Sequence, residues 1–556
     1  MSENKIQNIS WSASDRNKLI SKLKSEKFDI IIIGGGITGA GVFRDIMMRA
    51  TDVKEDLKIL LIDKNDFAFG TSNRSSKLAH GGIRYLALGD FEVVKESTTE
   101  RDWLRNNFPN LVRPQAFMYC AYKGAESKST IKMGLSIYDK LAENNNYKKY
   151  RWLTHEELIE MEPKLDIETT VGKGAGLYYD TNINDARLTL ESIKEGVFRG
   201  GIAVNYVKVD SLLKNDDKVI GVNVIDVINE QQFQIKAKKV INATGIWIDS
   251  LLENQTDKII RPTKGVHIIV PKENVGNNVA MTFRAEDKRT FFCIPRGDFD
   301  LIGTTDTDYN GSYNEVYCKK EDADYLIRSI KKYFPKAKLN YSEIISSYAG
   351  LRPLINEPGK SEGAVSRKHM IIESENGMIT ISGGKLTIFR LMAEQLVKKL
   401  IELNDLDIPF KENLTKELYL ISYKKSDWEK DNSKIDINLE EDILNYLYQE
   451  YGKGINTIIT IIRDNPEMKK RLITKRPFIL GEIQYILEHE FVPKVIDVLY
   501  RRTEIWMLIH PSQQPNVAQE VADLMASYYS WSNDKREKEI KEYLDQIYKN
   551  SFFYVK

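Results

Sequence analysis

Glycine and acidic residues near the N-terminus have the types and the spacing that bind a dinucleotide. An apolar run, Ile30–Ile33, leads directly into the turn Gly34-Gly-Gly-Ile-Thr-Gly39. Gly34 permits a tight turn, Gly36 lets the backbone approach a pyrophosphate, and Gly39 lets the next helix pack closely on the strand. The free N–H groups at the start of that helix would then hold the diphosphate.

A second apolar run supplies the acid that completes this pattern. Lys58-Ile-Leu-Leu-Ile-Asp63 reads as a strand that ends in a carboxylate. A carboxylate at this point of a βαβ unit accepts hydrogen bonds from an adenosine ribose. Strand, turn, helix, strand and acid in this order are much more specific than the glycines alone, so the sequence predicts a nucleotide site.

Two later segments again combine a strand with a turn of small residues. Val240-Ile-Asn-Ala-Thr-Gly245 would bring backbone amides to another face of a cofactor. In Ile379–Arg390 a strand, a double glycine and a helix beginning near Leu386 follow one another, and the N–H groups of that helix would stabilise negative charge on a reduced ring. These segments add to the expected cofactor contacts Gly245, Gly384, Leu386 and Thr387.

Composition limits the class of protein. The chain has 556 residues, which suggests two to four domains, and a net charge of +1 that gives no reason to expect a nucleic-acid partner. The hydrophobic fraction is 42% and the mean hydropathy is −0.40, as in globular proteins. The three cysteines are scattered and form no CxxC pair, which favours a reducing compartment and argues against a zinc ribbon.

The elements that must position these residues fall into three regions. Residues 1–28 form a polar N-terminal extension without the apolar core of a signal peptide, with a helix expected at about 14–25. Strand and helix patterns alternate from residue 29 to about 404, and helical spacing dominates from 405 to 556. The charged run Ser422–Asn438 reads as a solvated linker or loop.

A hydroxyl-rich and basic segment after Asp63 indicates the class of enzyme. It reads Gly70-Thr-Ser-Asn-Arg-Ser-Ser-Lys-Leu-Ala-His80-Gly-Gly-Ile-Arg-Tyr-Leu86 and resembles the signature of FAD-dependent glycerol-3-phosphate dehydrogenases, the aerobic, quinone-linked family. Later landmarks of that family have counterparts in the same order, and the resemblance spans about residues 29 to 510. They are Ile302–Asp306, Tyr348–Leu354, Ser366-Arg367, Gly383–Thr387 and Leu499–Thr503.

The resemblance implies the fold. We expect an α/β, glutathione-reductase-like FAD-binding domain with an inserted antiparallel substrate-binding sheet, followed by a helical C-terminal domain. The FAD-dependent oxidoreductase domain would span 29–404, and its FAD-binding part would be discontinuous, at about 29–100, 165–255 and 350–404. The helical domain would span 405–556.

The chemistry of alcohol oxidation requires a cofactor. A hydride must leave carbon and a proton must leave oxygen, and because no side chain accepts a hydride, a flavin is needed. FAD is favoured because hydroxyl groups follow the ribose acid closely enough to reach its diphosphate and ribityl chain. These hydroxyls belong to Thr71, Ser72, Ser75 and Ser76.

The resemblance also implies a site for a phosphorylated substrate. Arginine suits a phosphate because its planar fork donates paired hydrogen bonds. We expect Arg352 and Arg367, each at the end of a strand, to bind the phosphate and the carbonyl or hydroxyl oxygen, with the division between them left open. The expected substrate contacts also include Arg84, Tyr85, Thr305 and Lys385.

The catalytic residues expected are His80, Arg352 and Lys385. His80 is the natural proton acceptor, since imidazole titrates near neutral pH, although a structural role is equally open. Lys385, water, or Arg352 acting by polarising the substrate are the alternative routes, and Lys385 could instead stabilise the anionic flavin. No metal is expected, because the calcium-loop-like segment from Asp306 has Tyr317 at its twelfth position and reads as a hairpin turn.

The expected reaction is oxidation of sn-glycerol 3-phosphate to dihydroxyacetone phosphate by hydride transfer to FAD, with electrons passed to a quinone. The alternative is the related oxidase, which uses O2 and makes hydrogen peroxide. The enzyme is expected in the cytoplasm, with a homodimer and a peripheral contact with the inner face of the membrane kept open. The apolar stripe of Lys535–Tyr548 is expected to pack on the helical domain, and membrane binding is the alternative.

Overall fold

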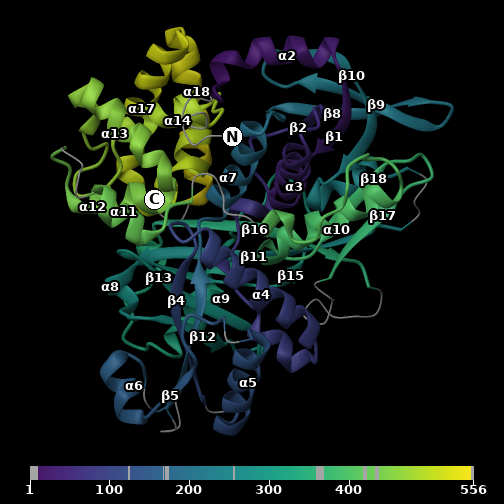
Figure 1. Cartoon of the computed structure of the whole chain (residues 1–556). Helices are drawn as coiled ribbons and strands as arrows, with labels where there is room; N and C mark the ends of the chain where they lie inside the picture. The colour runs from purple at the N-terminus through teal and green to yellow at the C-terminus, as the bar shows by residue number, and fades with distance from the viewer. Residues whose placement is uncertain are drawn as a thin grey trace.

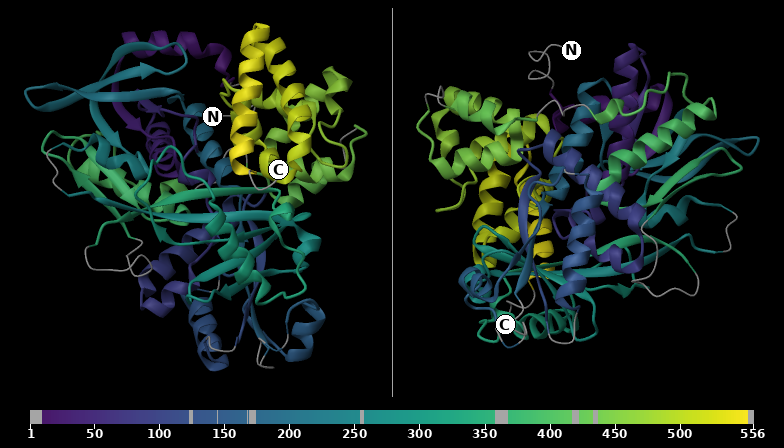
Figure 2. Two further views of the ribbon diagram at one scale, coloured as in Figure 1. Left: turned by 180° about the vertical axis from the view of Figure 1, so that it is seen from behind. Right: turned by 60° about the horizontal axis from the view of Figure 1, so that its bottom comes forward.

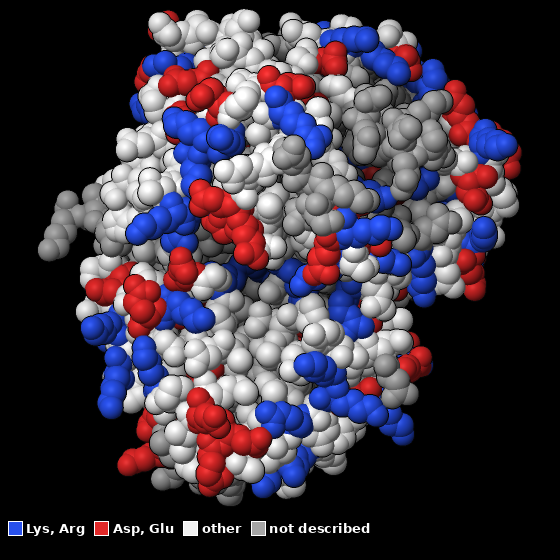
Figure 3. Space-filling model, turned by 60° about the vertical axis from the view of Figure 1, so that its left-hand side comes forward, with Lys and Arg blue, Asp and Glu red and all other residues white. Residues whose placement is uncertain are grey.

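The computed structural model describes residues 10–122, 126–143, 145–166, 168, 174–253, 257–357, 368–416, 422–432 and 437–551. Two β-sheets stand against each other, and the C-terminal helices lie beside the first sheet (Figure 1). This is the expected α/β fold with an inserted sheet and a helical C-terminal domain. Within the described ranges, no helix combines the length and the apolar composition needed to cross a bilayer. Basic and acidic side chains are interspersed over the face shown in Figure 3.

The first sheet has a parallel centre. Its strand order is β17-β18-β10-β1-β2-β7, with β8 and β9 extending from β10, and β17 and β9 run antiparallel to their neighbours. The strands are β1 (Lys27–Ile33), β2 (Ile59–Ile62), β7 (Ile202–Val204), β8 (Val207–Asn215), β9 (Lys218–Asp226), β10 (Gln231–Asn242), β17 (His369–Glu373) and β18 (Ile379–Gly383). The helices around it are α2 (Arg16–Ser25), α3 (Ile37–Val53), α7 (Asp185–Phe198) and α10 (Phe389–Glu402).

The four isoleucines of β1 explain its central place. Ile30–Ile33 are buried, and β1 pairs in parallel with β2 on one side and β10 on the other. A strand covered on both faces reads as a continuous apolar run, as here. Gly34 then turns with φ +108°, and a Cβ on Gly39 would overlap the Gly34 carbonyl oxygen, so α3 packs directly on the turn.

The second sheet is the inserted one. Its order is β15-β11-β14-β13-β12-β4-β6-β3, with β16 beside β11 and β5 beside β6. Pairing is antiparallel except between β4 and β12, so the inserted sheet is mixed rather than purely antiparallel. The strands are β3 (Leu78–Ala79), β4 (Arg113–Cys120), β5 (Arg151–Leu153), β6 (Ala175–Asn182), β11 (Ile260–Pro271), β12 (Ala280–Arg284), β13 (Thr290–Arg296), β14 (Phe299–Gly303), β15 (Thr307–Asp308) and β16 (Ser346–Ile355).

Helices flank this second sheet. A 3₁₀ helix, η3 (Ile83–Leu88), precedes α4, and another, η8 (Leu386–Ile388), precedes α10, so the helix expected near Leu386 opens with a 3₁₀ turn. The α-helices of this part are α4 (Phe91–Asn107), α5 (Lys128–Leu141), α6 (His155–Met161), α8 (Lys272–Val275) and α9 (Lys320–Lys331).

The C-terminal part is helical. Its helices are α11 (Lys425–Asn432), α12 (Glu441–Tyr451), α13 (Ile455–Asp464), α14 (Leu480–His489), α15 (Val495–Asp497), α16 (Ile505–Leu508), α17 (Gln514–Tyr529) and α18 (Asn533–Asn550). Ile540, Tyr543 and Ile547 of α18 are buried in the core shared with α17, so the apolar stripe packs on the helical domain as favoured.

The interpretation of Ser422–Asn438 as a solvated linker or loop was wrong. Helix α11 occupies part of this segment, and its Trp428 is 3% exposed. The Trp428 ring stacks on Tyr448 with centroids 5.4 Å apart and an interplanar angle of 11°. One aromatic residue thus anchors a helix whose other positions are mainly charged, and composition alone does not reveal such an anchor.

Buried ion pairs join the helical domain to the first sheet. Asp66, three residues after Asp63, is fully buried and accepts from Arg501 Nε at 2.5 Å and from Arg502 Nη2 at 3.1 Å. Arg501 also pairs with Asp497 at 2.5 Å. The arginines belong to the π-helical turn η12 (Val498–Arg502), which packs on α7. The C-terminal helices, drawn in yellow, lie beside the first sheet in Figures 1 and 2. Burial alone would raise the pKa of Asp66, but the two arginines hold it below its ordinary value.

We predict that Asp66→Asn destabilises the protein strongly, because it removes the carboxylate that pairs with buried Arg502 and one of the two that pair with buried Arg501. Breaking a buried pair on one side costs about 3–5 kcal/mol in the free energy of unfolding. Thermal unfolding is the measurement. The matched control is Glu520→Gln, which removes an exposed carboxylate paired with Lys470 and should change the free energy of unfolding by about 0.5 kcal/mol or less. Equal midpoints for both variants would contradict the prediction.

Candidate active site

A cavity of about 840 Å³ lies at the carboxyl ends of the parallel strands, where the second sheet closes over them. Open α/β sheets bind their ligands at this edge. Of the site residues predicted from the sequence that fall within the described chain, all line this cavity except Gly39 and Thr305. Arg367 lies outside the described residues.

Asp63 ties the glycine turn to the second strand. Its Oδ2 accepts from Gly35 N at 2.7 Å and its Oδ1 accepts from Asn65 N at 2.8 Å. Burial raises the pKa of Asp63 to about 6, and the two backbone hydrogen bonds oppose this rise. Each carboxylate oxygen retains a second lone pair, so the group that shapes the turn can also accept from a ribose hydroxyl.

The N-terminus of α3 opens onto the cavity. Gly36 precedes the helix, and Ile37 N donates to Ser72 Oγ at 2.9 Å. A Cβ on Gly36 would lie 3.2 Å from the same hydroxyl oxygen, which is a very close approach for a side chain. The wall facing the positive end of the helix therefore consists of backbone and one hydroxyl, as a diphosphate requires.

The other hydroxyls of this segment connect the wall to its surroundings. Thr71 Oγ1 donates to the Leu351 carbonyl oxygen at 2.5 Å, which joins the segment to β16. Ser75 Oγ donates to Asp185 Oδ2 at 2.7 Å, which joins it to α7. Ser76 Oγ lies 2.9 Å from His267 Nε2. These three hydroxyls line the cavity and also hold its wall in shape.

Arg352 stands inside β16, close to the C-terminal end of the strand. Its guanidinium pairs with Asp306 at 3.0 Å and donates to Thr304 Oγ1 at 2.9 Å. On the neighbouring strand β11, Gly265 makes room for it, since a Cβ there would lie 2.5 Å from Arg352 Nη2. The guanidinium is thus held in one orientation at the cavity wall.

Thr305 differs from the expectation that it lines the pocket. Its side chain is 4% exposed, and its hydroxyl accepts from Val266 N at 3.0 Å within the sheet. Its carbonyl oxygen accepts from Arg352 Nη2 at 3.0 Å. The neighbouring Thr304 lines the cavity instead, because successive side chains of an extended segment point to opposite faces.

Two cations flank one aromatic ring at the substrate side of the cavity. Arg84 Nη2 donates to the Tyr85 hydroxyl at 3.0 Å. Lys385 Nζ lies 3.9 Å from the centroid of the Tyr85 ring and donates to Ser97 Oγ at 3.0 Å. Cation–π attraction to the ring offsets part of the repulsion between the two charges. Segments far apart in the sequence therefore form one basic corner.

His80 lies beside this basic corner, immediately after β3. Burial is the largest cause that lowers the pKa of His80 to about 4, and Lys385 and Arg84 contribute, while Asp180 opposes them. The imidazole is therefore neutral around pH 7. Its backbone carbonyl accepts from Thr387 Oγ1 at 3.3 Å, which connects the end of β3 to η8.

The sequence did not identify His267 as a site residue. It lies on β11, lines the cavity and stacks on Tyr348 with centroids 4.8 Å apart. Burial, followed by the charges of Arg352 and Lys77, lowers the pKa of His267 to about 3. The strand pattern of 266–271 indicated the strand, but only the pairing of β11 with β16 brings this ring to the cavity.

Comparison with known proteins agrees with this geometry. The family described as FAD dependent oxidoreductase matches residues 29–390, and the C-terminal domain of alpha-glycerophosphate oxidase matches residues 380–536. The chain is 34% identical to the aerobic glycerol-3-phosphate dehydrogenase of Bacillus subtilis (strain 168), over 96% of this chain and 97% of the relative. It is 33% identical to the enzyme of that name from Staphylococcus epidermidis, with the same coverage.

A solved structure extends this likeness to the fold. The glycerol-3-phosphate dehydrogenase from Bacillus halodurans complexed with FAD has a TM-score of 0.79 and 29% identity, covering 97% of this chain and 98% of that one. The chain belongs to the FAD-dependent glycerol-3-phosphate dehydrogenase family. FAD is its cofactor, and it is an FAD-dependent oxidoreductase.

The cavity suits both halves of FAD by residue type. The start of α3 and Asp63 suit the diphosphate and the adenosine ribose. The two glycines before η8 have φ of +79° and +71°, so the backbone at Gly383 and Gly384 turns sharply toward the cavity. Among the described residues, no three His, Cys, Asp or Glu side chains gather in a way that could hold a metal ion.

We predict that Asp63→Ala weakens FAD binding by about 10- to 100-fold, since it removes a charged hydrogen-bond acceptor worth about 1.5–3 kcal/mol and releases the turn at Gly35. Fluorescence titration of the apoprotein with FAD measures this. Asp29→Ala is the matched control, because Asp29 also accepts a backbone N–H, from Lys58 at 2.8 Å, but lies at the opposite end of β1. An unchanged affinity of the Asp63 variant would exclude the role in cofactor binding.

Proposed function

We propose that this enzyme oxidises sn-glycerol 3-phosphate to dihydroxyacetone phosphate, with FAD as the hydride acceptor and a quinone as the final electron acceptor. The observation that carries the proposal is the group of cations around a neutral imidazole at one end of the cavity. The names of the full-length relatives support the substrate.

Arg84, Lys385 and Arg352 are assigned to the substrate phosphate and the neighbouring oxygen. A phosphate monoester carries close to two negative charges at neutral pH, and hydrogen bonds to a charged group contribute about 1.5–3 kcal/mol each. Two or three such contacts supply most of the affinity of a small metabolite. Arg367, outside the described residues, stays a predicted further contact.

His80 is assigned as the proton acceptor. Its ring is neutral in the working pH range and half-buried at the cavity wall, so it can take the proton of the substrate hydroxyl as the C–H hydride leaves. Arg352 polarises the same oxygen as it becomes a carbonyl. FAD, when bound, supplies the acceptor for the hydride. Lys385, at the start of η8, is suited to stabilise negative charge that develops nearby.

The electron acceptor separates two closely related enzymes. The dehydrogenase passes electrons to a quinone, and an oxidase passes them to O2. The C-terminal match carries the name of an oxidase domain, which favours O2 as the second candidate.

Anaerobic addition of glycerol 3-phosphate to the purified flavoprotein tests the proposal. We expect the absorbance of oxidised flavin to bleach, and Arg352→Ala to need a substantially higher substrate concentration for half-bleaching. Glycerol without phosphate is the matched substrate control. An enzyme that glycerol 3-phosphate does not bleach would contradict the substrate assignment. A quinone analogue and O2, added separately to the reduced enzyme, show which acceptor reoxidises it faster.

We predict that His80→Asn slows reduction of the flavin by about 10²–10⁴-fold, the usual contribution of a general base. Half-bleaching should occur at a similar substrate concentration, because the cations that hold the phosphate are intact. Stopped-flow absorbance under anaerobic conditions gives both quantities. His510→Asn, at the start of a 3₁₀ helix in the C-terminal domain, is the control and should behave as the unaltered enzyme. A His80 variant with full reduction rate would remove the proton-acceptor assignment.

A further inference from the structure

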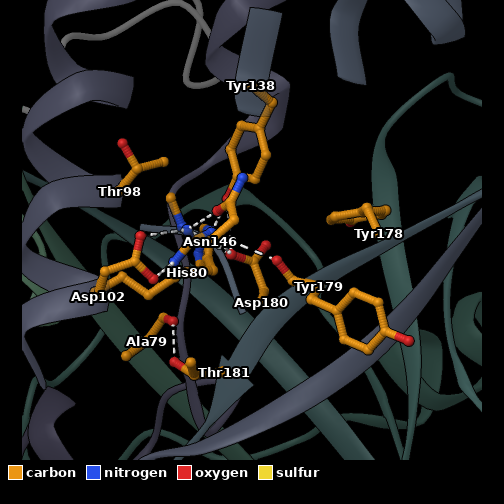
Figure 4. Close-up of polar contacts among 12 residues, drawn as sticks. Ala79, His80, Thr98, Asp102, Tyr138, Asn146, Tyr178, Tyr179, Asp180 and Thr181 are labelled. Carbon is orange, nitrogen blue, oxygen red and sulfur yellow. Dashed lines mark hydrogen bonds and ion pairs between the residues drawn. The ribbon is translucent and has the colours of Figure 1, made fainter. Parts of the chain in front are cut away.

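A buried cluster of polar and charged side chains lies behind His80, and the proposed function does not use it. Its centre is Asp180 on β6, which is 4% exposed and lines the cavity. Asp180 Oδ1 accepts from Tyr138 at 2.7 Å, from Arg101 Nη1 at 2.8 Å and from Gly81 N at 3.2 Å. Figure 4 shows His80, Asp180 and Tyr138 close together in this cluster.

The cluster holds the backbone next to His80. A Cβ on Gly81 would overlap both the Tyr138 hydroxyl and the Thr98 side chain, so the chain passes as close to them as a glycine allows. The Gly81 N–H is bonded to Asp180, and the His80 carbonyl accepts from Thr387. The peptide group between His80 and Gly81 is therefore held at both its carbonyl and its N–H.

Arg101 in turn fixes the carboxylate. It extends from α4, where it donates to both oxygens of Asp102, from Nη2 at 2.8 Å and from Nε at 3.1 Å. Its Nη1 atom remains directed at Asp180. All three charged side chains are at most 4% exposed, so water screens their charges little.

Oδ1 of Asp180 takes all three hydrogen bonds given above, while Oδ2 takes none from the residues that the structure describes. Among the described residues, therefore, none donates to this second oxygen, and Asp180 lines the same cavity as His80. The charged groups that face His80 are Lys385 from the start of η8, Arg84 from η3, Arg101 from α4 and Asp180 from β6. The three cations oppose a positive charge on the imidazole, and Asp180 favours it.

We propose that Asp180 is the positioning carboxylate of His80, fixing the peptide group that follows this residue and stabilising the imidazolium that forms when the ring takes the substrate proton. Arg101 and Tyr138 hold Asp180 in place. This inference rests on the proposed function, in which the hydroxyl proton moves to His80 while the hydride leaves carbon. A carboxylate beside a catalytic imidazole has this effect in general, because it compensates charge in a poorly solvated site.

Asp180→Asn tests the proposal in the FAD-loaded enzyme. We expect flavin reduction at saturating glycerol 3-phosphate to slow at least 10-fold, with a similar concentration for half-bleaching. Removing the negative charge makes His80 harder to protonate, so the acidic limb of the rate against pH should move to lower pH by about half a unit or more. The substrate phosphate titrates identically with both enzymes, so it does not affect this comparison. Asp180→Glu, which retains the charge, should recover the position of the limb at least in part.

Asp102→Asn is the matched control, because it removes the other carboxylate of Arg101, on the far side of the guanidinium from Asp180. It should lower the thermal midpoint without moving the pH limb. If Asp180→Asn lowers only the yield or the thermal midpoint, and rate per bound FAD and pH limb are unchanged, the role is merely structural and the proposal is overturned. Should Asp180→Asn fail to fold, the test rests on Tyr138→Phe, which removes one of the donors that hold Asp180, and an unaltered rate and pH limb in that variant would overturn the proposal.

A double variant separates this proposal from the proposed function. In the His80→Asn background, Asp180→Asn should slow flavin reduction no further, since the ring it serves is gone. If Asp180→Asn slows both backgrounds equally, Asp180 acts independently of His80 and the positioning role fails, while the base assignment stands. If His80→Asn alone keeps the full rate of flavin reduction, the assignment of His80 as the base is wrong, and the role of Asp180 that rests on it is wrong as well.

Discussion

The ion pairs of Asp66 with Arg501 and Arg502 are the interaction on which the arrangement of the molecule depends. Charges buried this deeply are tolerated only when each is paired and hydrogen-bonded. The pairs therefore favour a single docked position of the helical domain on the first sheet. Asp66 follows Asp63, the acid predicted to bind the adenosine ribose, by three residues. The contact between the C-terminal domain and the first sheet therefore lies in the segment that directly follows Asp63.

In the proposed function, the active site must bind a phosphate dianion and also accept a proton. The basic corner around Tyr85 is the proposed phosphate site, and its cations lower the pKa of His80. A neutral imidazole among cations is available to accept a proton, but it binds that proton weakly. The carboxylate of Asp180, itself held by Arg101, has the opposite effect on the pKa of His80, which is why we assign it to the proton-transfer step.

The location of segments with a local sequence pattern was predictable. The glycine turn, Asp63 and the run from His80 to Tyr85 act through backbone geometry and local order, and those segments do line one cavity. Residues whose roles depend on partners far along the chain were missed or misjudged. Trp428 turns a charged run into a helix by stacking on Tyr448, and Thr305 faces the sheet because of the register between β11 and its neighbours. His267 and Asp180 reach the cavity only through strand pairing.

The sequence by itself determined the class of fold, the cofactor and the chemical types available for the substrate, because motifs of closely spaced residues encode turns, helix starts and charge. The tertiary structure alone decided which of these residues lie together, which hydroxyls hold the cavity wall in place, and which charged groups surround His80. The physical reason is that burial and pairing control both orientation and pKa, and both depend on segments such as β3, β6, α4 and η8 that are distant in sequence and adjacent in space.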